Sequence, residues 1–72
     1  MVVFDGLNRK MAERHMKTRD LSMKTNIKER TLCNKIAMRN EFTLSEMRAI
    51  QNVLGGSLDE LFTKVEIGDA FA

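Results

Sequence analysis

Apolar residues recur at intervals of three and four along most of the chain, which is the spacing of one face of a helix. The clearest stripe consists of Leu44, Met47, Ile50, Val53 and Leu54, and two consecutive glycines end it. Glycine after the last apolar position is a typical helix stop. The pattern predicts five short helices, at about residues 5–14, 18–25, 28–37, 44–54 and 58–63.

Residues that favour helix ends or tight turns lie between these apolar stripes. Residues 43–46 (Thr-Leu-Ser-Glu) and 57–60 (Ser-Leu-Asp-Glu) both have the capping-box form. In that motif the hydroxyl and the carboxylate each accept a hydrogen bond from a backbone amide at the start of the helix. Asp5 is expected to cap the first helix, and Asn26 tolerates the left-handed conformation of a tight turn. His15 is interpreted as a loop residue near that same conformation.

The composition supports an all-helical domain. The 72 residues include no proline, tryptophan or tyrosine, so the chain lacks residues that a small β-sandwich or barrel needs. The expected fold class is all-α, a compact bundle of five short helices. Residues 1–64 would form one domain and residues 65–72 a C-terminal tail. The tail either frays or docks on a partner, with Val65, Ile67 and Phe71 packing across a dimer interface.

Several classes of function find little support in the residues present. Cys33 is the single cysteine and His15 the single histidine, so we expect no internal disulfide, metal site, cofactor or catalytic cluster. An enzyme is therefore not expected. No apolar run approaches the length of a membrane span, and the N-terminal segment is too short for a signal peptide. These features predict a cytoplasmic protein without a membrane partner.

Charge is distributed unevenly along the chain. Residues 7–40 contain ten Lys and Arg against three Asp and Glu, an excess of +7. Residues 41–72 contain two against six, a net charge of −4. A basic half of this kind indicates a surface that meets nucleic acid or an acidic protein partner.

Two short helices joined by a tight turn, the second polar and basic outside, form the outline of a helix-turn-helix. The strings that carry a family resemblance include the first helix junction, the turn and the two closing helices: residues 11–21 (Met-Ala-Glu-Arg-His-Met-Lys-Thr-Arg-Asp-Leu), Asn26-Ile27, Thr31-Leu32, 42–47 (Phe-Thr-Leu-Ser-Glu-Met) and 56–62 (Gly-Ser-Leu-Asp-Glu-Leu-Phe). Over about residues 7–62 the chain resembles phage Cro/repressor-type helix-turn-helix regulators. The resemblance implies a λ-repressor-like DNA-binding domain in a bacterial host cell, with residues 28–37 as the recognition helix.

The candidate binding residues combine the positions that the resemblance places near DNA with the cations of the basic half. Glu29 departs from the family's usual residues; it suits a cytosine amino group or a basic partner surface, or simply favours the helix dipole. Asn34 has the amide that reads adenine. The full set of DNA- or partner-binding candidates is Lys17, Thr18, Arg19, Lys28, Glu29, Arg30, Asn34, Lys35 and Arg39.

The sequence is compatible with two functions. The first is a small transcriptional regulator of a phage lysis-lysogeny switch, which binds operator DNA as a homodimer or heterodimer. The second is an antirepressor similar to phage modulator-of-repression proteins, which binds a partner phage repressor through the same surface and binds DNA poorly alone. The antirepressor is favoured by positions, such as Glu29, at which the chain departs from the DNA-reading residues usual in the family. It is also favoured by Met23, Met38 and Cys33, which we expect to be exposed beside the recognition helix.

Overall fold

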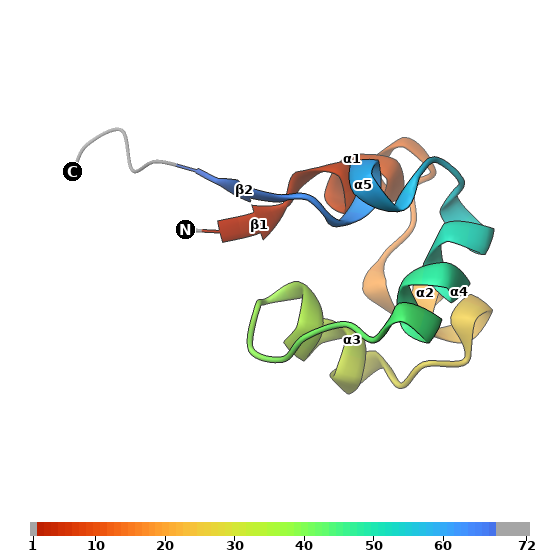
Figure 1. The fold of residues 1–72 in the computed structure, drawn as a ribbon. Coiled ribbons are helices and arrows are strands. Elements are labelled where there is room, and N and C mark those ends of the chain that lie inside the picture. The colour runs from red at the N-terminus through yellow and green to blue at the C-terminus, as the bar shows by residue number, and fades with distance from the viewer. Residues whose placement is uncertain (1, 68–72) are drawn as a thin grey trace.

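The computed structural model describes residues 2–67 and places five helices between two short strands (Figure 1). The predicted all-α class with a helix-turn-helix is confirmed, and the bounds of each helix lie within one or two residues of the predicted ones. The elements in chain order are β1 (Val2–Phe4), α1 (Asp5–Glu13), α2 (Thr18–Thr25), α3 (Glu29–Ile36), α4 (Leu44–Leu54), α5 (Leu58–Phe62) and β2 (Lys64–Glu66).

One cluster of buried apolar side chains holds the helices together. Every helix contributes at least one residue to it, so the detachment of any helix would expose apolar core surface to water. Phe4 of β1 extends the cluster to the N-terminal strand. The buried set is Phe4, Leu7, Met11, Leu21, Leu32, Ile50, Leu54 and Leu61.

Three aromatic rings close the core at the end where the strands leave it. Phe4, Phe42 and Phe62 meet edge to face, with ring centroids 5.2 to 5.8 Å apart. This arrangement is the one that aromatic quadrupoles favour. The rings therefore tie β1, the loop before α4 and the end of α5 to one another.

The two strands were not predicted from the sequence. β1 and β2 pair antiparallel, with Val2 opposite Glu66, Val3 opposite Val65 and Phe4 opposite Lys64. Neither alternative considered for residues 65–72, fraying or docking on a partner, included this pairing. Each strand has only three residues, too few for a period-two pattern, and α1 packing against α5 brings them together. Phe71 lies outside the described residues.

The helix ends follow the predicted capping in one case and depart from it in two. Thr43 and Glu46 form the full reciprocal box, with bonds of 2.8 and 3.2 Å. Asp5 was wrongly expected to cap α1: it is the first helical residue, and its carboxylate accepts a bond from Arg9 instead (3.1 Å).

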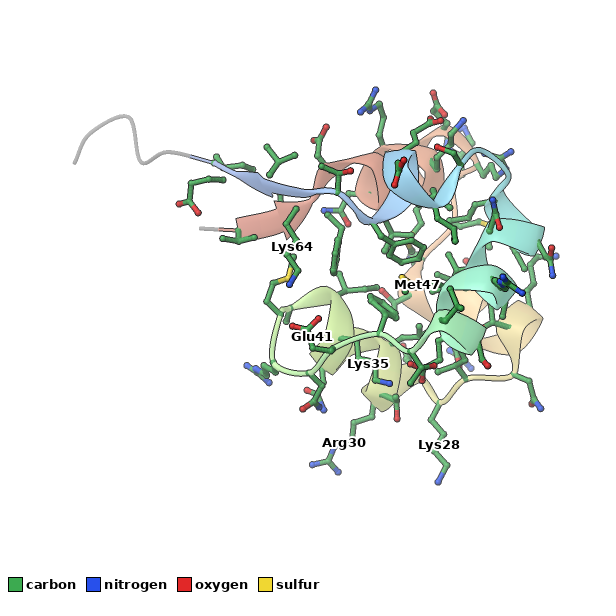
Figure 2. All side chains as sticks on the ribbon, in the orientation of Figure 1. Lys28, Arg30, Lys35, Glu41, Met47 and Lys64 are labelled. Carbon is green, nitrogen blue, oxygen red and sulfur yellow. The ribbon has the colours of Figure 1, made fainter. Side chains whose placement is uncertain are left out.

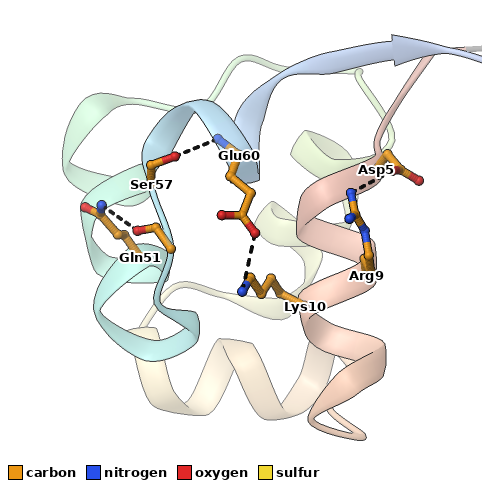
Figure 3. Close-up of polar contacts among 7 residues, drawn as sticks. Asp5, Arg9, Lys10, Gln51, Ser57 and Glu60 are labelled. Atoms are coloured by element: carbon orange, nitrogen blue, oxygen red, sulfur yellow. Dashed lines mark hydrogen bonds and ion pairs between the residues drawn. The ribbon is translucent and has the colours of Figure 1, made fainter.

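The predicted box at residues 57–60 is formed only in part. The Ser57 hydroxyl accepts a bond from the Glu60 amide at 3.0 Å (Figure 3). The Glu60 carboxylate pairs with Lys10 of α1, 3.3 Å from the ammonium nitrogen. Glu60 therefore links α5 to α1, which a motif confined to four residues could not indicate.

Backbone conformation confirms the two predicted left-handed residues, and the burial of Met38 corrects a prediction that its side chain is exposed. His15 and Asn26 both have positive φ, at 53° and 61°. Met38 also has positive φ, at 66°, and its side chain is half-buried against the core. Met38 was therefore wrongly expected to be exposed, whereas Met23 is 74% exposed and Cys33 is exposed as predicted.

Candidate nucleic-acid interface

The helix-turn-helix is formed by α2, the turn at Asn26 and α3. Leu21 of α2 and Leu32 of α3 are both fully buried, which fixes the two helices against a shared core. The turn is stabilised by the Ser22 hydroxyl, which donates to the Ile27 carbonyl. Such side-chain bonds satisfy backbone groups that a turn leaves without helical partners. The outward face of α3 is thereby held in a defined orientation.

The start of α3 carries three exposed charged groups. Lys28 is the N-cap residue, and Glu29 and Arg30 belong to the first turn; all three are exposed. Figure 2 shows Lys28 and Arg30 extending away from the body of the domain. The structure thus brings together two cations that flank one carboxylate, as the sequence predicts.

The start of α2 presents a second pair of cations. Lys17 and Arg19 are exposed, and Thr18 between them is half-buried. The Lys17 amide donates to the Asp20 carboxylate at 3.0 Å, which caps α2. That amide is used inside the domain, so the charged groups exposed at the start of α2 are the side chains of Lys17 and Arg19.

Lys35 does not have the outward placement that was expected. Its ammonium group pairs with the Glu46 carboxylate at the start of α4, and the two side chains are only 13% and 19% exposed. The same Glu46 oxygen accepts the bond from the Thr43 amide. Lys35 therefore attaches α3 to the cap of α4.

Asn34 and Arg39 contact each other at the end of α3. An Arg39 guanidinium nitrogen donates to the Asn34 amide oxygen at 3.4 Å. Readout of adenine uses both the oxygen and the nitrogen of an asparagine amide. The Arg39 bond is long and uses one of the two lone pairs of the Asn34 oxygen, so the amide keeps both a donor and an acceptor for adenine.

Two further cations lie beside a concavity that the sequence did not indicate. Arg14 and Lys24 line it together with the apolar side chains of Met16 and Val53. Arg14 and Met16 follow α1, Lys24 belongs to α2 and Val53 to α4, so no single local pattern could have grouped all four. None of them belongs to the candidate binding set.

The Lys35–Glu46 pair makes stability depend on pH. The hydrogen bond from Lys35 is the main cause that lowers the pKa of Glu46 from its ordinary value of 4.5, and the Thr43 amide adds to it. A carboxyl group whose pKa is lower in the folded state stabilises the fold above its unfolded pKa. That contribution is lost as the pH falls through the lower, folded-state value.

We predict that Glu46→Gln removes this part of the acid sensitivity. Glutamine keeps an oxygen for the Thr43 amide but carries no charge for Lys35, so about 1–2 kcal/mol of stability should be lost at neutral pH. Urea unfolding at about pH 6 and about pH 3 would measure this, and the variant should lose less stability between them than the wild type. Glu41→Gln, at an 85% exposed side chain, serves as the control. An unchanged pH dependence in Glu46→Gln would contradict the assignment.

Comparison with known families agrees with this geometry. Residues 6–66 match the Cro/C1-type HTH DNA-binding domain, a family of DNA-binding regulatory domains, and the chain belongs to that family. No curated protein and no solved structure gives a significant match to the chain.

Within residues 2–67, no helix is long and apolar enough to cross a membrane. The same residues contain no group of three His, Cys, Asp or Glu side chains that could hold a metal ion.

Proposed function

We infer that this protein is a small transcriptional regulator that binds operator DNA with α3 in the major groove. The observation that carries the proposal is the exposed pair Lys28 and Arg30 at the N-terminal end of α3, in a domain of a DNA-binding family. The N-terminal residues of a recognition helix are the ones that approach base edges. A lysis-lysogeny switch of a phage is the setting that we propose for it.

The exposed groups suggest a division of roles. Lys28 and Arg30 suit guanine acceptors or phosphates, and Glu29 between them suits the amino group of cytosine. Lys17 and Arg19, at the start of α2, would hold the phosphate backbone, which sets register without reading sequence. Lys35 has a structural role in this proposal, because its ammonium group is held by Glu46.

The direct test is binding to a labelled random-sequence duplex of about 30 base pairs, followed by fluorescence anisotropy during a salt titration. A DNA-binding domain should bind with a Kd of about 10⁻⁴ to 10⁻⁶ M or tighter, and the affinity should fall steeply with salt. That result would justify a search for the operator. Absence of binding at about 100 µM protein would contradict the proposal.

We predict that Arg30→Ala weakens DNA binding by about 1–3 kcal/mol, whereas Arg9→Ala leaves it nearly unchanged. Both substitutions remove one exposed guanidinium, but Arg9 lies on α1 and pairs with Asp5. Anisotropy at fixed salt compares the two, and Lys28→Ala should also reduce the salt slope by about one unit. Equal effects of Arg30→Ala and Arg9→Ala would show that only net charge matters.

A second candidate function is the antirepressor, which binds a phage repressor protein through the same surface. It is favoured by the ion pair that engages Lys35 within the domain, which leaves one cation fewer for contact with DNA. Glu29 is exposed and would meet the DNA-binding cations of the partner. Glu29→Lys separates the two candidates: it should strengthen nonspecific DNA binding, but it should abolish capture of a repressor encoded beside this protein.

A further inference from the structure

The concavity beside Arg14 and Lys24 lies where three helices end. Arg14 is the C-cap residue of α1, Lys24 belongs to the last turn of α2 and Val53 to the last turn of α4. Met16, in the loop between α1 and α2, completes the lining around a volume of about 560 Å³. The ends of α2 and α4 lie at the end of the domain opposite the two strands (Figure 1). This Arg14–Lys24 concavity shares no residue with the candidate DNA-binding set.

The more buried part of the lining is apolar. Met16 and Val53 are half-buried, and both pack against the core cluster. The Met16 amide donates to the Met11 carbonyl at 2.9 Å, which holds the loop against α1. Methionine adapts its side chain to apolar partners of different shape. An apolar group of a ligand would therefore leave water for a surface that the fold already holds in position.

Two cations border this apolar surface, and neither is engaged within the domain. Arg14 and Lys24 are exposed, and within residues 2–67 neither side chain takes part in an ion pair. The Arg14 guanidinium lies beside Gly55, since a Cβ built on that glycine would be 3.8 Å from the Nη2 atom. The last carbonyls of α1 accept bonds from backbone amides rather than from these side chains. Both cations therefore keep their N–H donors for a ligand.

The lining indicates a ligand that is both acidic and apolar, and one that belongs to a larger molecule. None of the four lining residues is fully buried, so the concavity covers one side of a ligand only. A small molecule needs most of its surface buried, whereas a protein segment is also held by contacts on either side of it. None of the four residues is aromatic, so the lining offers no ring on which a nucleic-acid base could stack.

We propose that the Arg14–Lys24 concavity is a docking site for an acidic segment of a partner protein, in which an apolar side chain lies between carboxylates. The apolar side chain contacts Met16 and Val53, and the carboxylates pair with the two cations. Charge-assisted bonds to the guanidinium orient the segment, and burial of the apolar side chain adds affinity. The proposal does not depend on DNA binding, because the two surfaces have no residue in common.

A peptide titration followed by NMR tests the chemistry of the ligand. The probe is a blocked peptide of sequence Glu-Asp-Leu-Leu-Asp-Glu. We expect a Kd between about 50 µM and 2 mM and the largest shifts at the amides of Met16, Lys24 and Val53. A peptide with serine in place of both leucines should bind at least about fivefold more weakly, because it has no apolar side chain to bury. Equal binding of the two peptides, shifts confined to α3, or no binding at about 5 mM would overturn the proposal.

Charge reversal tests the role of the two cations. Arg14→Glu combined with Lys24→Glu should weaken binding of the acidic peptide at least about tenfold. Arg9→Glu combined with Arg48→Glu makes the same change in net charge at two exposed cations outside the concavity, and is the matched control. The Arg14 and Lys24 double variant should also gain binding to Lys-Lys-Leu-Leu-Lys-Lys, which the wild type should not bind. A variant that unfolds normally in urea but lacks this gain would overturn the proposal, as would equal losses in the two double variants.

The random-sequence duplex distinguishes a protein partner from DNA. Because the concavity is separate from the start of α2 and α3, the Arg14 and Lys24 double variant should lose no more duplex affinity than the matched control. A loss at least about tenfold larger than that of the control would assign the concavity to DNA and overturn the proposal. If the wild type does not bind the duplex, the function proposed above fails, but the peptide titration still decides the present proposal.

Discussion

Gly6→Ala is expected to reduce the free energy of unfolding by at least about 2 kcal/mol, because the substitution places a methyl group inside the backbone of α5. A Cβ at Gly6 would lie 1.7 Å from the Glu60 carbonyl oxygen and 2.8 Å from its carbon. Neither atom is the end of a flexible side chain. The whole of α5 must move away from α1 to make room.

The expected loss of stability is opposite in sign to the usual effect of a glycine-to-alanine substitution in a helix. In an ordinary helix position, glycine to alanine gains about 1 kcal/mol, because glycine is the poorer helix former. Asn8→Ala, at an exposed position of the same helix, is the control and should leave stability unchanged or slightly higher. Urea unfolding of both variants measures the difference. A Gly6→Ala protein as stable as the wild type would show that α1 and α5 do not approach this closely.

The same close approach explains what the sequence could not predict. The helices follow from apolar spacing and local caps, which depend on residues three or four apart. The strand pair and the Lys10–Glu60 link depend on α1 meeting α5, which lies about fifty residues further along the chain. No local signal carries that information. Three-residue strands are also too short to show their period.

The candidate interface was predicted in outline but not in detail. Lys28, Glu29 and Arg30 are exposed at the start of α3, as the polar face of that helix indicated. Lys35 follows the buried Leu32 by three residues, so it borders the apolar stripe. Its long side chain can then reach Glu46 of the next helix. Helical spacing alone does not show whether a long side chain at the border of the apolar stripe extends into solvent or pairs with a group on the next helix.

Leu32→Ala is expected to cost about 2–5 kcal/mol of stability and to abolish DNA binding under conditions that the wild type tolerates. Leu32 is fully buried, and it is the one residue of α3 in the buried core. A domain of this length has about 4–11 kcal/mol in total, so the loss is a large fraction. Helix α3 would lose its one fully buried contact with α2 and the rest of the core.

Two matched variants separate loss of packing from loss of a contact. Cys33→Ala changes the neighbouring exposed residue and should alter neither stability nor DNA affinity. Leu32→Met keeps the side-chain volume, should cost less than about 1.5 kcal/mol and should retain binding. Unfolding by urea and anisotropy with the random duplex measure the two properties. If Leu32→Ala stays folded and binds like the wild type, α3 is held mainly by the Lys35–Glu46 pair, and Lys35→Met should then release it.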